Sequence, residues 1–125
     1  MNQNKVCLSI PAQKAYVPVV SLALSGLGMV LGLDVDLLGD LRTVAAESMD
    51  CLMNQAGRPV SIQMTAEVVE GRLCVRFCSC DREKGQQCDE LSVDITRGVL
   101  ETLMPTVELR TDENGVHGIE CSMPV

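Results

Sequence analysis

The stretch VSIQMTAEVVEGRLCVRF, residues 60–77, alternates apolar and polar residues on both sides of a short reversal at Glu70 and Gly71. Alternation with a period of two is typical of strands that bury one face and wet the other. The two runs therefore predict an antiparallel hairpin whose apolar face needs a cover. The positions of that apolar face are Ile62, Met64, Ala66, Val68, Leu73, Val75 and Phe77.

The segment before this hairpin predicts one strand and two helices. Pro11 ends the strand, Gly32 offers a stop for the first helix, and Asp34 is a suitable N-cap for the second. The expected elements are a strand over Lys5–Ile10, a helix from Gln13 or Ala15 to about Leu31, and a helix from Asp34 to about Asn54.

The segment after the hairpin predicts a third helix and a second hairpin. Helical spacing begins at Leu91 and stops before Pro105, and the turn TDENG, residues 111–115, separates two further alternating runs. Strands grouped in hairpins, with helices enough for one face, indicate an α+β two-layer sandwich with a mixed, mostly antiparallel sheet under about three helices. We expect residues 1–125 to form a single domain.

The charge and composition exclude some classes of function. The chain has a net charge of -7 and 2% aromatic residues, so we expect no nucleic-acid partner. Seven cysteines, an odd number, and the absence of a secretory signal pattern predict a cytoplasmic protein. Residues 15–33 carry no charge over 19 positions, enough to cross a bilayer, but small residues and the acidic sequence that follows favour a sheet-covering helix.

The predicted second helix contains LRTVAAESMDCLMNQA, residues 41–56, and this segment resembles the helix that supplies the acid and the magnesium-binding asparagine in GHKL (Bergerat-fold) ATPases. The whole chain is most similar to the bacterial anti-sigma-factor serine kinases. That resemblance implies a histidine-kinase-like ATPase fold. The residues that carry it are Ile10, Pro11, Ala12, Tyr16, Val17, Val20, Gly26, Gly32, Asp40, Leu41, Glu47, Leu73, Val75, Phe77, Leu103, Met104 and Val107.

The resemblance implies a general base at Glu47 and a magnesium ligand four residues later. That later position is Cys51, a soft thiol that does not suit a hard magnesium ion. Asp50 and Asn54 have the same spacing of four and offer a rival alignment. We favour the alignment on Glu47 because the rival one breaks the match of the preceding apolar positions.

The remaining nucleotide contacts of the family also match substituted positions. The aspartate that binds adenine corresponds to Ser79, with Asp81 as a slipped alternative. The glycines of the phosphate-binding lid correspond to Asp94 and Thr96, which the resemblance places at a helix start. A carboxylate there repels phosphate. Ser21 stands where relatives often carry an arginine used in docking.

The cysteines and the single histidine are weaker candidates for a site. Cys74, Cys78 and Cys80 share one strand face and Cys88 follows in a loop, which suggests zinc binding or redox sensing, but side chains on a flat strand do not converge. We favour ordinary packing, and we expect His117 to be structural or to face solvent. The methionines are interpreted as core filler, namely Met29, Met49, Met53, Met64, Met104 and Met123.

Three functions follow from these patterns. The favoured one is a regulatory protein-binding module that resembles an anti-sigma factor and has lost Mg-ATP binding and kinase activity, with no cofactor and no metal site. The first alternative is an active serine/threonine kinase that uses ATP, magnesium and Glu47. The second is a cysteine-based redox or metal-responsive module. The partners implied are a sigma factor or an anti-anti-sigma protein, with no membrane contact, and a homodimer through the polar, cysteine-bearing sheet face.

Overall fold

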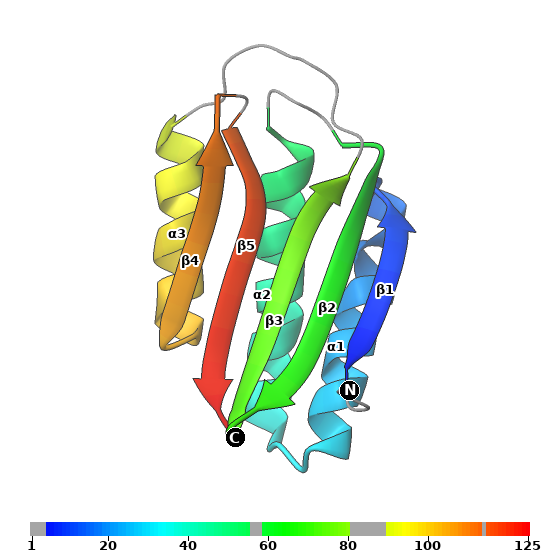
Figure 1. Cartoon of the computed structure of the whole chain (residues 1–125). Coiled ribbons are helices and arrows are strands. Elements are labelled where there is room, and N and C mark those ends of the chain that lie inside the picture. The colour runs from blue at the N-terminus through cyan, green and yellow to red at the C-terminus, as the bar shows by residue number, and fades with distance from the viewer. Residues whose placement is uncertain (1–4, 56–58, 81–89, 114) are drawn as a thin grey trace.

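Five strands form one sheet in a computed structural model that describes residues 5–55, 59–80, 90–113 and 115–125. The strand order is β1-β2-β3-β5-β4, and every neighbouring pair is antiparallel (Figure 1). The sheet is thus antiparallel throughout, where a mixed one was expected. The strands are β1 (Val6–Pro11), β2 (Ser61–Val69), β3 (Arg72–Cys80), β4 (Thr106–Asp112) and β5 (Gly115–Pro124).

The helices lie together on one face of this sheet (Figure 1). They are α1 (Val17–Val30), α2 (Val35–Met53) and α3 (Glu90–Leu103), and a short 3-10 turn over Lys14–Tyr16 precedes α1. The α+β two-layer sandwich expected from the grouping of strands and helices is therefore confirmed.

Both hairpins form, and the first has the turn that its sequence predicts. Glu70 and Gly71 have φ angles of 51° and 77°, the left-handed pair that suits the twist of a two-residue hairpin. The second turn is shorter than the expected TDENG, because β4 extends to Asp112 and β5 begins at Gly115. A register shift between Arg110 and Thr111 accompanies this turn.

The helix ends follow the predicted signals. Asp34 accepts a hydrogen bond from the backbone N–H of Leu37 at 2.9 Å, as an N-cap does, and Gly32 follows α1 with a φ of 76°. The α-helical part of the first helix begins at Val17, later than expected. No helix in the described part of the chain is both long enough and apolar enough to span a membrane.

The hydrophobic core lies between the helices and the sheet. Gly28 lies where α1 packs closely on α2, since a Cβ there would lie 2.6 Å from Leu38 Cδ2 and 2.9 Å from Leu41 Cδ1. Beside it, Arg42 Nε donates to Ser25 Oγ at 3.2 Å across the same contact. The largest fully buried side chains are Phe77, Leu24, Leu41, Met49, Leu52, Ile62, Met64, Leu73, Leu100, Met104, Ile119 and Val20.

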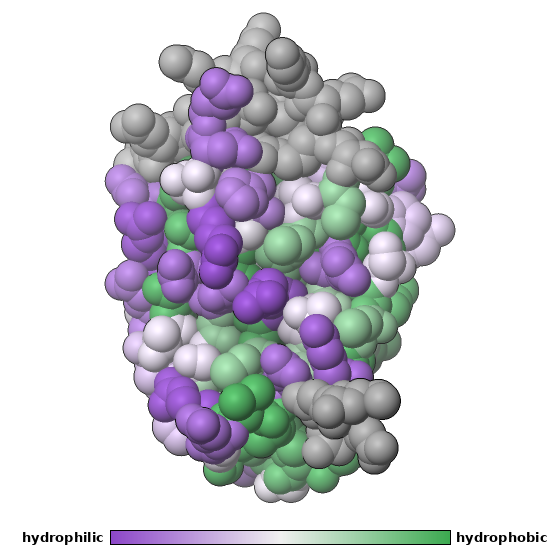
Figure 2. Space-filling model, viewed as in Figure 1, coloured by the Kyte–Doolittle hydropathy of each residue, from purple (hydrophilic) through white to green (hydrophobic). Residues whose placement is uncertain are grey.

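No helix of the described residues lies over the other face of the sheet. Figure 2 views this open face and shows hydrophilic residues spread across most of it. The register aligns its polar side chains in cross-strand rows, such as Thr65, Arg76, Glu120 and Glu108 on β2, β3, β5 and β4. The candidate side chains are thus divided between this open face and the helix-covered side of the sheet.

Candidate functional site

The α2 helix carries the two positions that match the acid and the magnesium ligand of the GHKL ATPases. Glu47 is half-buried at the edge of the helix, whereas Cys51 is only 4% exposed and belongs to the core. One turn of helix separates them, as the sequence spacing requires. The magnesium position therefore holds a buried thiol instead of an oxygen ligand.

Gln55 ties this end of α2 to the sheet. Its Nε2 donates to the Cys51 carbonyl at 2.8 Å and lies 3.6 Å from Cys51 Sγ, while its Oε1 accepts the backbone N–H of Val116 at 2.9 Å. Gln55 is only 5% exposed. Sequence reasoning missed this residue, because a glutamine beyond a helix end carries no pattern that predicts a buried amide joining two elements.

The rival alignment is not supported by the surroundings of its two residues. Asp50 and Asn54 both lie on the exposed side of α2, and Asn54 Nδ2 donates to the carbonyl of Asp50 at 2.8 Å and to its Oδ1 at 3.0 Å. These bonds let Asn54 close the helix end. Asp50 therefore lies on the solvated side of α2.

Ser79, at the position of the adenine-binding aspartate, is the penultimate residue of β3. It pairs with Ile62, whose side chain is buried under the helices, so Ser79 faces the core side of the sheet. Its Oγ is buried and makes no hydrogen bond within the described residues, and the same holds for Ser48 Oγ on α2. The alternative residue, Asp81, lies outside the described part of the chain.

The two positions that match the phosphate-binding lid lie inside α3. The helix begins at Glu90, so the expected placement of Asp94 and Thr96 at a helix start is wrong, because helical spacing already begins upstream of them. Asp94 is exposed and lies 3.8 Å from Arg97 Nη1, whereas Thr96 is 6% exposed. The two side chains therefore point to opposite sides of α3 and do not form one phosphate site.

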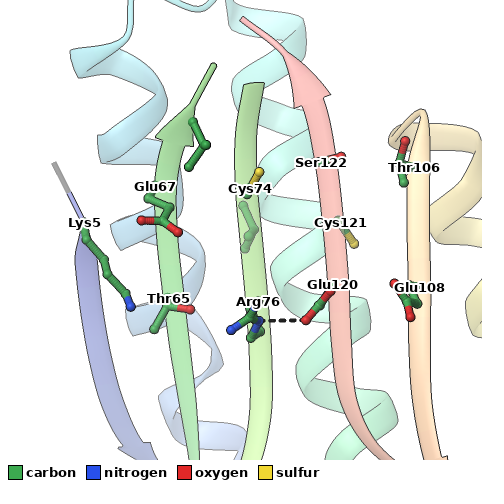
Figure 3. A pocket seen from close by; sticks show the side chains of 12 residues that line it. Lys5, Thr65, Glu67, Cys74, Arg76, Thr106, Glu108, Glu120, Cys121 and Ser122 are labelled. Atoms are coloured by element: carbon green, nitrogen blue, oxygen red, sulfur yellow. Dashed lines mark ion pairs between the residues drawn. The ribbon is translucent and has the colours of Figure 1, made fainter. Parts of the chain in front are cut away.

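The open face of the sheet contains a hollow with a volume of ≈ 280 Å³ (Figure 3). Small polar side chains lie among charged ones from β2, β3, β5 and β4, together with Lys5 just before β1. The hollow is separated from Glu47 by the sheet itself. Its polar lining residues are Lys5, Thr65, Glu67, Cys74, Arg76, Thr106, Glu108, Glu120 and Ser122.

Glu120 is the centre of the charge arrangement beside this hollow. Its Oε1 lies 2.8 Å from Arg76 Nε, the pair marked in Figure 3, and 2.9 Å from Arg110 Nη2. The Arg110 side chain passes beside Gly118, where an added Cβ would lie in ordinary van der Waals contact with it at 3.5 to 3.6 Å. Positive and negative side chains are thus both present beside the hollow and partly neutralise each other. The hollow therefore does not select between an anionic and a cationic small molecule.

The cysteines do not converge on a site. Cys74, Cys78 and Cys80 follow one another along β3 on the open face, where they pair with Glu67, Gln63 and Ser61, while Cys88 lies outside the described residues. Within the described ranges, no group of three or more His, Cys, Asp or Glu side chains could hold a metal ion. His117 is half-buried on β5.

The methionine interpretation is confirmed for most positions and wrong for one. Met49, Met64, Met104 and Met123 are buried, but Met29 is 68% exposed on α1. The helical spacing of α1 places Met29 on the side that faces away from α2 and the sheet. An apolar residue on an apolar helix predicts burial, and only the position of the neighbouring elements decides otherwise.

Cys121 on β5 is a cysteine with a strongly shifted pKa. Its side chain faces the core, and burial raises the pKa of the thiol to about 12 from 9.0. The neutral thiol is therefore favoured in the folded state.

This shift predicts a loss of stability in alkali. Above about pH 9 the unfolded chain loses the Cys121 proton while the folded chain keeps it. The free energy of unfolding therefore declines by about 1.4 kcal/mol per pH unit toward pH 12. Urea unfolding of wild type and Cys121→Ala at about pH 8 to 10.5 tests this. The stability gap between them should narrow as pH rises, and a constant gap would contradict the assignment.

Comparisons with known proteins do not assign this chain to a family. A scan against protein-family models finds no match, and a search of curated proteins finds none either.

Proposed function

We propose that this chain is a regulatory protein-binding module, similar to an anti-sigma factor, that acts by contact and without Mg-ATP. Its partner would be a sigma factor or an anti-anti-sigma protein. The sequence resemblance implies a nucleotide site on this chain, and one structural observation at that site supports the loss of nucleotide binding. The observation is the burial of Cys51, with a soft thiol at the magnesium position.

The surroundings of Cys51 support this proposal. Magnesium requires oxygen ligands and usually keeps several bound waters. The Cys51 thiol supplies no oxygen, and at 4% exposure it is shielded from water. Gln55 closes the adjacent helix end by bonding to Cys51 and to Val116. At the other matched positions Asp94 brings a carboxylate and Thr96 is packed in the core, so the set offers no cluster of donors for phosphate.

Calorimetric titration with Mg-ATP, and separately with Mg-ADP, tests the proposal. We expect no saturable heat for wild type or for Glu47→Ala. Complex formation with a purified sigma factor or anti-anti-sigma protein should be equal with and without nucleotide. Saturable micromolar binding of Mg-ATP that Glu47→Ala weakens would support the active kinase instead and contradict this proposal.

The variant Cys51→Asn restores the residue type of the family at the magnesium position but should not restore nucleotide binding. We expect it to bind no Mg-ATP and to lose about 1–3 kcal/mol of unfolding free energy, because the amide enters a packed position where its donors lack partners. The control Cys51→Ala removes the thiol without adding a polar group. If Cys51→Asn gains saturable Mg-ATP binding, the other matched positions can still bind nucleotide, and the loss of binding in the wild type depends on Cys51 alone.

A further inference from the structure

The outer face of α1 is an apolar surface that nothing in the described chain covers. Leu22 is 64% exposed, Met29 68% and Val30 82%, and Val19 lies beside them at 44%. The whole segment from residue 15 to residue 33 carries no charge. A helix that is apolar on all sides is normally buried on all sides, yet α1 packs against α2 and the sheet with its inner side only.

We propose that this outer face of α1 binds the outer face of α1 in a second copy of the chain, with the two helices antiparallel around a two-fold axis midway between Leu22 and Gly26. The contact is independent of nucleotide and of the function proposed above. It uses the helical face of the molecule, not the polar, cysteine-bearing sheet face expected from the sequence.

The shape of this face suits contact with itself. Leu22 and Met29 project on either side of Gly26, and a Cβ at Gly26 would meet no atom within 4 Å. The same surface therefore offers both a projection and a notch. A two-fold contact needs this self-complementarity, because each copy must supply what the other receives.

The charges at the two ends of α1 favour the antiparallel arrangement. Exposed Lys14 precedes the helix, whereas exposed Asp34 and Asp36 follow it. An antiparallel pair brings Lys14 of each copy toward the acidic end of the other. Each chain has a net charge of -7, so a contact between two copies must keep like charges away from the two-fold axis. The uncharged stretch of residues 15–33 keeps them away.

The size and charge of this face favour a second copy of the chain as its partner and disfavour a membrane surface. The 14-residue helix is about 21 Å long, and exposed Tyr16 and Val35 extend its apolar surface at either end. Such a surface can form the apolar centre of a moderate protein interface with a polar rim. Interfacial helices that bind anionic lipid carry basic residues along the polar face, and α1 has none.

Sedimentation velocity of the full chain, in reducing agent and up to about 100 µM, tests the proposal. We expect a dimer for wild type, and at least thirtyfold weaker association, about 2 kcal/mol, for Leu22→Glu. Ile95→Glu is the matched control, because Ile95 is 59% exposed on α3 and should leave the dimer intact. Gly26→Leu fills the notch without a clash inside one copy, so it should weaken the dimer while the monomer stays folded.

Exchanging the end charges tests the direction of the helices. Lys14→Glu alone and Asp36→Lys alone should each weaken the dimer by about threefold, and the double variant should recover the wild-type constant. A monomeric wild type at about 100 µM would overturn the proposal. So would a dimer that persists in both Leu22→Glu and Gly26→Leu, since another face would then hold the copies together. If the double variant shows no recovery, the antiparallel arrangement is wrong.

Discussion

The variant Gln55→Glu should lose about 3–5 kcal/mol of unfolding free energy at pH 7, because it places a carboxylate where a buried amide joins two elements. The new oxygen can still accept the Val116 N–H, as Gln55 Oε1 does at 2.9 Å. The ionised side chain cannot donate to the Cys51 carbonyl, which Gln55 Nε2 reaches at 2.8 Å. A buried negative charge beside a carbonyl oxygen remains uncompensated.

The loss should depend on pH with a defined sign. Burial should raise the pKa of the introduced carboxyl group above the unfolded value of about 4.3, so the protonated form, which can again donate, is favoured in the folded state. The variant should thus be closest to wild type below about pH 4.3 and lose stability as pH rises from there toward the folded pKa.

Urea unfolding of Gln55→Glu and Gln55→Leu, each relative to wild type, checks this prediction. Gln55→Leu breaks the same hydrogen bonds without adding a charge, so it should cost about 1–3 kcal/mol at every pH. A loss in Gln55→Glu that does not change between about pH 4 and pH 7 would show that the side chain at this position reaches water.

The variant Phe77→Ala should lose about 3–5 kcal/mol, a large share of the roughly 5–15 kcal/mol that stabilises a domain of this kind. Phe77 is fully buried on the central strand β3, where it pairs with Met64 on β2 and Ile119 on β5. It is also the only phenylalanine of the chain. Removing its ring leaves a cavity at the centre of the core.

Chemical and thermal unfolding of Phe77→Ala and of Phe77→Leu measure this effect. Phe77→Leu keeps most of the apolar volume and should cost less than about 1.5 kcal/mol. Flexible Met64 could fill part of the cavity in Phe77→Ala. A loss below about 1.5 kcal/mol in Phe77→Ala would mean that this filling is nearly complete and that the core does not depend on the ring.

Local signals in the sequence predict most of the helices and strands. The alternation through residues 60–77 identifies β2 and β3, and Glu70 with Gly71 identifies their turn, because hairpin geometry depends on adjacent residues. The cap at Asp34 and the stop at Gly32 likewise depend on interactions within a few residues. These parts of the prediction are confirmed.

The candidate site was less predictable than the elements. Its positions could be named from the resemblance, but Thr96 proves to be packed in the core and Asp94 exposed on the other side of α3. Gln55 was missed altogether. Gln55 matters because it accepts a hydrogen bond from Val116, which is 61 residues away in the sequence. No local sequence pattern predicts so distant a partner.

The sequence by itself determined the elements, most of their ends and the presence of an apolar layer beneath the helices, because these depend on periodicity and on short-range hydrogen bonds. Only the tertiary structure decided the strand order, in which β5 lies between β3 and β4, and which side of each helix is covered. The outer face of α1 shows the difference. Its residues are as apolar as those of the core, but exposure is set by the elements that pack around a helix, and α2 and the sheet cover only the other side.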